Sequence, residues 1–162
     1  MDTATVAIWL AAAALIVHTI EEAWLPYYQE FKPSWRSLIF NRSLFLEHGP
    51  IFAFVIVLAI IGWRSPVIGG LLPAISLTHA LLDHGGLSWK SRSLRPGSWT
   101  GIFLLIPISI WLYIFSVSNN LFELHELLIS GVIGTAISVW LFWMVDQELK
   151  NRSHPHQYIA VF

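Results

Sequence analysis

Five long apolar runs constrain the fold of this chain more than any other feature. They cover residues 4–25, 45–63, 67–84, 100–117 and 125–145. A helix needs about 20 mostly apolar residues to cross a bilayer, and lipid cannot satisfy unpaired backbone groups, so long apolar runs are expected to be helices. The sequence therefore predicts an all-α fold, an integral membrane bundle of about five transmembrane helices.

The composition agrees with a membrane protein. Charged residues make up 12% of the chain and hydrophobic residues 56%, whereas a soluble domain is about 25% charged. The net charge of −1 and the lack of a basic arm give no indication of a nucleic-acid partner. The chain has no cysteine, which excludes disulfides, thiolate metal sites and cysteine nucleophiles.

The basic residues predict the orientation. With five spans, the 26–43 loop, the 85–98 loop and the C-terminal tail share one side of the membrane. Eight basic residues fall there: Lys32, Arg36, Arg42, Lys90, Arg92, Arg95, Lys150 and Arg152. Only Arg64 falls on the other side. Because basic residues gather in cytoplasmic loops, we expect the N-terminus outside and the C-terminus in the cytoplasm.

The same pattern predicts the domain organisation. Residues 1–145 are expected to form a single transmembrane helical bundle domain, and residues 146–162 a polar cytoplasmic tail. The 26–43 connection mixes aromatic and basic residues, which is typical of a segment that lies on the lipid headgroups. On the fifth run, the small residues at Gly131, Gly134, Thr135 and Ser138 are typical of close helix packing.

Ionisable residues collect at the predicted cytoplasmic ends of three spans. Each such group costs about 2.5–3.5 kcal/mol inside a membrane, so their clustering needs an explanation. The eight are His18, Glu21 and Glu22 in the first span, Glu47 and His48 in the second, and His79, Asp83 and His84 in the third. Because these span ends meet at one side of the bilayer, we expect the eight side chains to lie near one another.

Helical spacing predicts which of these side chains share a face. In the first span, spacings of three and four place both carboxylates on the face of His18. In the third span, an α-helix places Asp83 below His79, four residues on, and turns His84 about 100° away from Asp83.

This clustering points to a metal site or a proton-transfer site. Carboxylates crowded in a low dielectric must be protonated, paired or neutralised by a cation. Imidazole and carboxylate are good ligands for zinc, iron and manganese, and helix bundles build metal sites from inward Glu and His side chains. We therefore expect one or two divalent ions. The candidate ligands are His18, Glu22, Glu47, His48, His79, Asp83 and His84, with Glu21 and Glu22 as candidate catalytic acid or base.

Purely structural interpretations compete at most of these positions. A lone histidine inside a membrane is more often a packing residue than a ligand. Asp83 and His84 border the Gly85-Gly86 turn, where they could face water. Proline is favoured in the first turn of a helix, so the second helix could begin at Pro50 and leave Glu47 and His48 at the interface. On the outer side, residues 125 and 126 are expected to form an interfacial helix cap.

The chain resembles a known family in two stretches. His18-Thr19-Ile20-Glu21-Glu22 is similar to the signature of the uncharacterised bacterial and fungal membrane proteins named after their HXXEE motif. The second stretch runs from His79 through a basic loop to Pro96-Gly97, Thr100 and Pro107, and the resemblance covers roughly residues 14–110. In this stretch His79 takes the place of a family-like Asn, and the motif His falls on Asp83 or His84. The functional histidine is thus left open between His79 and His84.

The resemblance implies a small polytopic membrane protein with a polar site, and it implies no reaction. We expect the protein in the bacterial inner (plasma) membrane. The leading hypothesis is a membrane-embedded metal-dependent hydrolase or oxidoreductase that acts on a lipid-like or small hydrophobic substrate. The first alternative is a metal-free acid/base enzyme, of isomerase or cyclase type, that uses a Glu–His pair. The second is a non-enzymatic transporter subunit or a ligand- or metal-binding membrane module.

Overall fold

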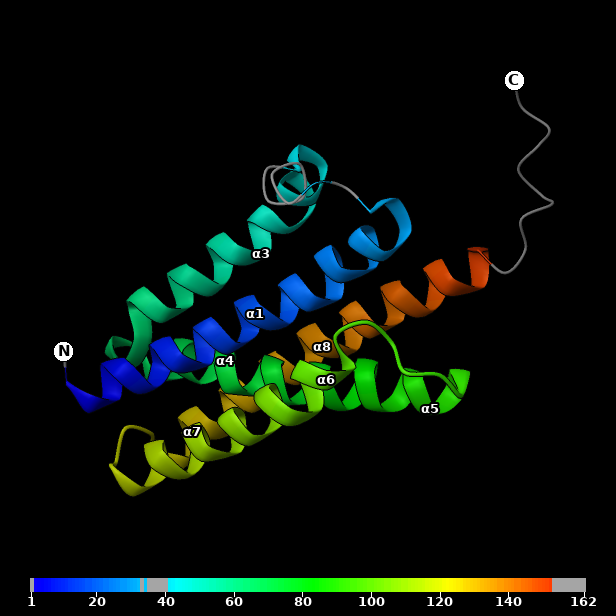
Figure 1. The fold of residues 1–162 in the computed structure, drawn as a ribbon. Helices are drawn as coiled ribbons and strands as arrows, with labels where there is room; N and C mark the ends of the chain where they lie inside the picture. The colour runs from blue at the N-terminus through cyan, green and yellow to red at the C-terminus, as the bar shows by residue number, and fades with distance from the viewer. Residues whose placement is uncertain (1, 33, 35–40, 153–162) are drawn as a thin grey trace.

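A computed structural model describes residues 2–32, 34 and 41–152 of the chain, and these residues are almost wholly helical, with no strand among them. The long helices run roughly along one common direction (Figure 1). They are α1 (Thr3–Phe31), α3 (Arg42–Ile61), α4 (Pro66–His79), α7 (Ile106–Ser118) and α8 (Leu124–Arg152). The shorter elements are the 3-10 helix η1 (Gly62–Arg64), the π-helices η2 (Ala80–Leu87) and η3 (Gly101–Leu105), and the α-helices α5 (Ser88–Ser91) and α6 (Ser98–Thr100).

Five segments are long and apolar enough to cross a membrane. They are Thr3–Pro26, Leu44–Arg64, Pro66–Lys90, Ser98–Ser118 and Leu124–Met144. Each agrees with a predicted run, which confirms the all-helical fold and the count of five. The largest difference lies in the third span, where the π-helix η2 and α5 carry the helical path on to Lys90.

The second span begins before its proline. Asn41 caps α3, because its side-chain oxygen accepts a hydrogen bond from the backbone N–H of Leu44 at 3.1 Å. The alternative start at Pro50 is therefore wrong, and Glu47 and His48 lie on the second turn of the helix. Pro66 stands in the first turn of α4 after η1, so α3 and α4 are adjacent antiparallel helices, as predicted.

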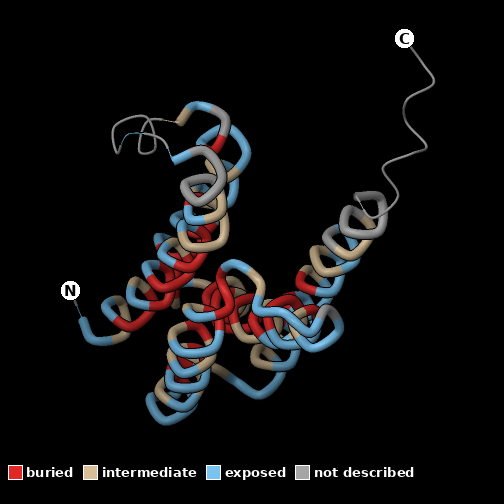
Figure 2. The backbone as a smooth tube through the Cα atoms, turned by 45° about the vertical axis from the view of Figure 1, so that its right-hand side comes forward, coloured by how far each residue is buried: buried red, intermediate tan, exposed pale blue. Residues whose placement is uncertain are grey.

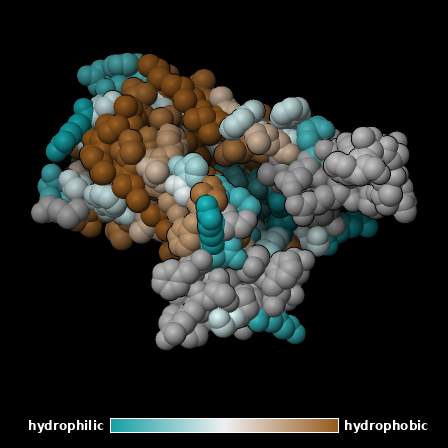
Figure 3. Space-filling model, turned by 90° about the horizontal axis from the view of Figure 1, so that it is seen from above, coloured by the Kyte–Doolittle hydropathy of each residue, from teal (hydrophilic) through white to brown (hydrophobic). Residues whose placement is uncertain are grey.

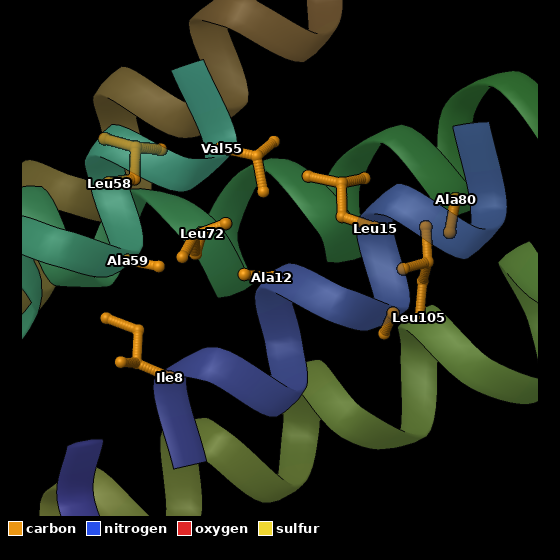
Figure 4. Close-up of a cluster of buried hydrophobic side chains, with 10 residues drawn as sticks. Ile8, Ala12, Leu15, Val55, Leu58, Ala59, Leu72, Ala80 and Leu105 are labelled. Atoms are coloured by element: carbon orange, nitrogen blue, oxygen red, sulfur yellow. The ribbon is translucent and has the colours of Figure 1, made fainter. Parts of the chain in front are cut away.

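The apolar core lies where α1 meets its neighbours. Figure 2 shows buried residues on the inward sides of the helices and exposed ones on the outward sides. In Figure 4, Ile8, Ala12 and Leu15 of α1 face Val55 and Leu58 of α3. Ala59, Leu72, Ala80 and Leu105 complete the labelled cluster. Small alanines among larger side chains allow these backbones to approach closely.

Helices α4 and α8 share the largest contact between helices. Ser138 of α8 donates a hydrogen bond to the carbonyl of Ile75 at 3.3 Å, and it accepts one from Thr78 at 2.6 Å. A side chain at Gly134 would collide with α4. The packing role predicted for Gly134 and Ser138 is thus confirmed. It is wrong for the other two small residues, because Thr135 is exposed and a Cβ atom added at Gly131 would meet no atom of another helix within 4 Å.

The outer surface is largely apolar. Figure 3 shows a broad hydrophobic area on the side of α3, with hydrophilic residues at its margins. Of the 26–43 connection, α1 takes the part up to Phe31, and residues 33 and 35–40 lie outside the described residues. The predicted headgroup segment therefore stays a prediction, as does the orientation of the termini. Helix α8 passes residue 145 without a break and ends at Arg152, so the start of the predicted tail is helical.

Candidate metal centre

The HXXEE sequence lies on a regular turn of α1 and supplies two members of a buried cluster. His18 and Glu22 are four residues apart, so they share a face of the helix. The Nε2 atom of His18 lies 3.7 Å from Oε2 of Glu22. His18 is buried, and Glu22 is 30% exposed. This is the arrangement that the spacing predicts.

The third span supplies two more members through a change of helix type. His79 ends α4, and His84 lies in the π-helix η2. In an α-helix, residues five apart point about 140° away from each other. In a π-helix the hydrogen bonds join residue i to i+5, so the turn is wider and residues five apart point less far from each other than in an α-helix. The rings of His79 and His84 accordingly meet, with centroids 5.1 Å apart.

The α-helical geometry expected from the sequence is therefore wrong at this point. It placed Asp83 with His79 and turned His84 away, whereas the structure brings His84 into the cluster. Both Asp83 and His84 are buried, which also overturns the alternative that they face water. Both His79 and His84 lie in the cluster, so its geometry does not choose between them.

Four side chains converge on one point. The Nε2 atom of His18 lies 3.2 Å from Nε2 of His79 and 3.0 Å from Nε2 of His84. Oε2 of Glu22 lies 3.8 Å from Nε2 of His79. One ligand atom from each of the four lies within 4.8 Å of the others. Two ligands of a tetrahedral zinc ion are about 3.3–3.5 Å apart, given bonds of about 2.0–2.2 Å. The donor set and its spacing thus fit a divalent metal ion.

A close backbone approach seals one side of this cluster. Gly97 adopts a φ of +81°, a conformation that favours glycine. A Cβ atom at Gly97 would lie 2.8 Å from Cε1 of His84 and 3.0 Å from Cε1 of His18. At Gly101, one turn later, it would lie 3.1 Å from Cδ2 of His84. The start of the fourth span therefore packs its bare backbone on the imidazole rings.

Thr100 orients the central histidine. Its hydroxyl donates a hydrogen bond to the carbonyl of Gly97 at 3.4 Å, and it lies 2.9 Å from Nδ1 of His18. In the tautomer in which Nδ1–H of His18 donates to this hydroxyl, the lone pair of Nε2 faces the cluster. Histidines that bind metals usually have such a partner on the other ring nitrogen.

Glu21 contacts the same segment and not the cluster. Its Oε2 atom accepts the backbone N–H of Thr100 at 2.9 Å. Glu21, the first carboxylate of the motif, thus holds the residue whose hydroxyl lies next to His18. Thr100 and Gly97 were not predicted as site residues. The available signal was their place in the second family-like stretch, which contains Pro96-Gly97 and Thr100.

The other candidate residues lie outside the group of four. Asp83 forms a buried ion pair with Arg95, with 3.2 Å between Oδ1 and Nε. His48 donates from Nδ1 to the carbonyl of Leu44 at 3.0 Å, and its ring lies against Trp24. Glu47 is exposed.

On the opposite end of the bundle, the start of α8 is capped as expected. Oε2 of Glu126 accepts the backbone N–H of Glu123 at 2.8 Å, which is the return half of a capping box. His125 is exposed and lies 3.3 Å from the carboxylate of Glu123. The predicted cap is confirmed.

The sequence also matches a known protein family. Residues 9–112 match the model of a family described as "Protein of unknown function with HXXEE motif". The chain belongs to the HXXEE family. The match includes all four clustered residues, as well as Thr100, and it ends before α8. No curated protein and no solved structure matches the chain.

In this HXXEE protein a large cavity adjoins the cluster. Its volume is about 710 Å³, and its walls come mainly from α1, α3, α4 and α8. Polar and charged residues gather at one end: His18, Glu22, His48, His79, Asp83 and Arg95. The remaining wall is mostly aliphatic and aromatic. The four clustered side chains therefore have an apolar chamber beside them.

Proposed function

We propose that this protein is an intramembrane enzyme that holds one divalent metal ion between His18, His79 and His84 and acts on a lipid-like substrate. The observation that carries the proposal is the convergence of three Nε2 atoms on one point, at 3.0 and 3.2 Å from the central one. Helix packing satisfies a buried histidine with one hydrogen-bond partner for each nitrogen. Helix packing alone does not explain why three imidazole rings and a carboxylate converge on one point inside a membrane.

Three imidazoles suit zinc, and they also suit iron or manganese when a carboxylate is near. Such an ion polarises a carbonyl oxygen or activates water. Glu22 lies farther from the central nitrogen than the two histidines do, at 3.7 Å. We assign it the exchange of a proton with the substrate as general base or acid.

The other residues of the motif and the loop hold this arrangement in place. Thr100 fixes the tautomer of His18, and Glu21 fixes Thr100 through its backbone N–H. Gly97 and Gly101 bring the start of the fourth span against the rings and exclude water from that side.

Elemental analysis of the purified protein tests the proposal. We expect about one transition-metal ion per chain in the natural protein and none in His18→Ala. His125→Ala serves as the matched control, because this exposed histidine lies at the other end of the bundle, and it should keep the metal. Circular dichroism and gel filtration show whether His18→Ala is folded. Natural protein from metal-replete cells that carries no stoichiometric metal would overturn the proposal.

One observation favours the metal-free acid/base alternative. The Nδ1 atoms of His79 and His84 are buried and have no hydrogen-bond partner among the described residues, whereas metal-bound histidines usually donate there. In that case Glu22 and His79, 3.8 Å apart, would exchange the proton. Thermal unfolding of chelator-treated protein separates the two. Zinc, iron or manganese should raise the Tm if the site binds metal, and an unchanged Tm supports the alternative.

A further inference from the structure

We infer that the substrate is a membrane lipid whose acyl chain enters the cavity sideways from the bilayer, between α3 and α8. Its polar end would then lie at His18 and Glu22. This inference rests on the proposed function, because it names the substrate class of that same centre and the route by which the substrate arrives.

The cavity is polar at one end only, and its length fits a lipid chain. On α3 its lining extends from His48 to Leu58, and on α4 and η2 from Leu72 to Asp83. Ten or eleven helical residues span about 15 Å at 1.5 Å per residue. One leaflet of the hydrocarbon core, half of about 30 Å, has the same thickness. A chain that lies parallel to the helices therefore fills the chamber from its polar end to its apolar end.

The opening of the cavity faces lipid. The lining residues on α1 and α4 are mostly buried, so these two helices form the closed back wall. Exposed apolar lining residues include Ile51 (41%) and Phe54 (43%) on α3 and Trp140 (57%) on α8. Helices α3 and α8 both contain membrane spans. An opening between two spans leads into the bilayer, so a chain can enter without passing through water.

Discrimination between lipids must then come from contacts at the polar end of the cavity and from the length of the cavity. Lipid tails are as apolar as the cavity wall, so moving a chain from bilayer to cavity gains little from the hydrophobic effect. The histidines, Glu22 and the Asp83–Arg95 pair form the polar end. A water-soluble substrate would leave the long apolar part of the cavity unfilled. A membrane lipid fills both the apolar part and the polar end.

Photo-crosslinking in lipid nanodiscs tests the inference. The probe is a long-chain fatty acid with a diazirine at its methyl end, and peptide mass spectrometry locates the adducts. Leu72 (0% exposed) and Leu58 (4% exposed) line the apolar end, and bulk lipid does not reach them. We expect saturable adducts at these two residues. Val57 and Val139 face lipid, and their labelling should not saturate. A probe with the diazirine beside the carboxyl group should label the end near His48 instead.

Two tryptophan substitutions on α8 provide a matched pair. Ile137→Trp fills the cavity from its lining, whereas Val139→Trp adds the same bulk on the exposed side of the helix. We expect Ile137→Trp to lose the adducts at Leu58 and Leu72 and Val139→Trp to keep them. Both variants should retain the metal, which shows that they are folded.

The outcomes separate this inference from the proposed function. Metal-loaded natural protein without adducts at the two buried leucines would overturn the lipid cavity and leave the metal centre standing. Equal loss of the adducts in both tryptophan variants would also overturn it. Saturable adducts in a protein that binds no metal would support the lipid cavity and refute the metal enzyme.

Discussion

The two helical segments that supply the histidines do so by different geometry. In α1, a regular α-helix, His18 and Glu22 share a face because they are four residues apart. In the third span, the rings of His79 and His84 meet although the residues are five apart, because the wider turn of the π-helix η2 reduces the angle between them. A spacing rule applies only to the helix type for which it was derived. The first pair could thus be predicted from the sequence, and the second could not.

The prediction with the largest expected effect asks whether His84 or Asp83 binds the metal ion. His84→Ala should lower metal affinity by more than the roughly 10–100-fold that loss of an outer partner causes, because it removes a ligand. The α-helical register would instead make Asp83 the ligand. The double variant Asp83→Asn/Arg95→Gln removes the ion pair as a whole and avoids an unpaired buried charge. We expect it to keep the metal in a chelator-competition assay, and loss of metal there would favour the α-helical register.

The contact between Thr100 and His18 of α1 is tested by Thr100→Val. Valine keeps the shape of threonine and removes the oxygen that lies 2.9 Å from Nδ1 of His18. Metal affinity should fall by about 10–100-fold. Thr100→Ser restores the hydroxyl and should recover most of the affinity in the same assay. If valine and serine behaved alike, the hydroxyl would have no role in orienting the ring.

The start of the fourth span packs closely against His18 of α1 and His84 of η2. Gly97→Ala places a Cβ against His84 and His18 in a left-handed conformation, which should destabilise the fold by about 1–2 kcal/mol. Gly131→Ala is the control, since residue 131 is helical and an added Cβ atom there would meet nothing within 4 Å. It should be neutral or slightly stabilising in chemical denaturation. Equal effects at the two positions would contradict the close approach.

The smallest expected effect is that of Glu21→Gln. The amide oxygen can still accept the N–H of Thr100, but a hydrogen bond to a charged group is stronger than a neutral one by about 1 kcal/mol. We expect the Tm to fall by about 2–4 °C and the metal content to be unchanged. Glu47→Gln, at an exposed glutamate on α3, should change the Tm less. Loss of metal in Glu21→Gln would place Glu21 among the ligands.

The fold was largely predictable, because span length and apolar character are local properties of a sequence. The five spans followed from them, as did the meeting of polar residues from the first and third spans, whereas Glu47 and His48 of the second span lie outside the cluster. Prediction from the sequence failed where contacts between helices determine the local structure and the partners of side chains. The π-helix leaves no period in the sequence, and an aspartate beside a histidine gives no sign that it will pair with Arg95. The role of Thr100 depends on the fourth span packing against the first, which spacing within one helix does not reveal.

The four clustered residues and the residues that support them all lie between positions 18 and 101, whereas α8 contributes to the wall of the cavity. Chains are made from the N-terminus, so every candidate ligand has been synthesised before the last span leaves the ribosome. In the order of biosynthesis, the clustered side chains therefore precede the helix that completes the cavity wall.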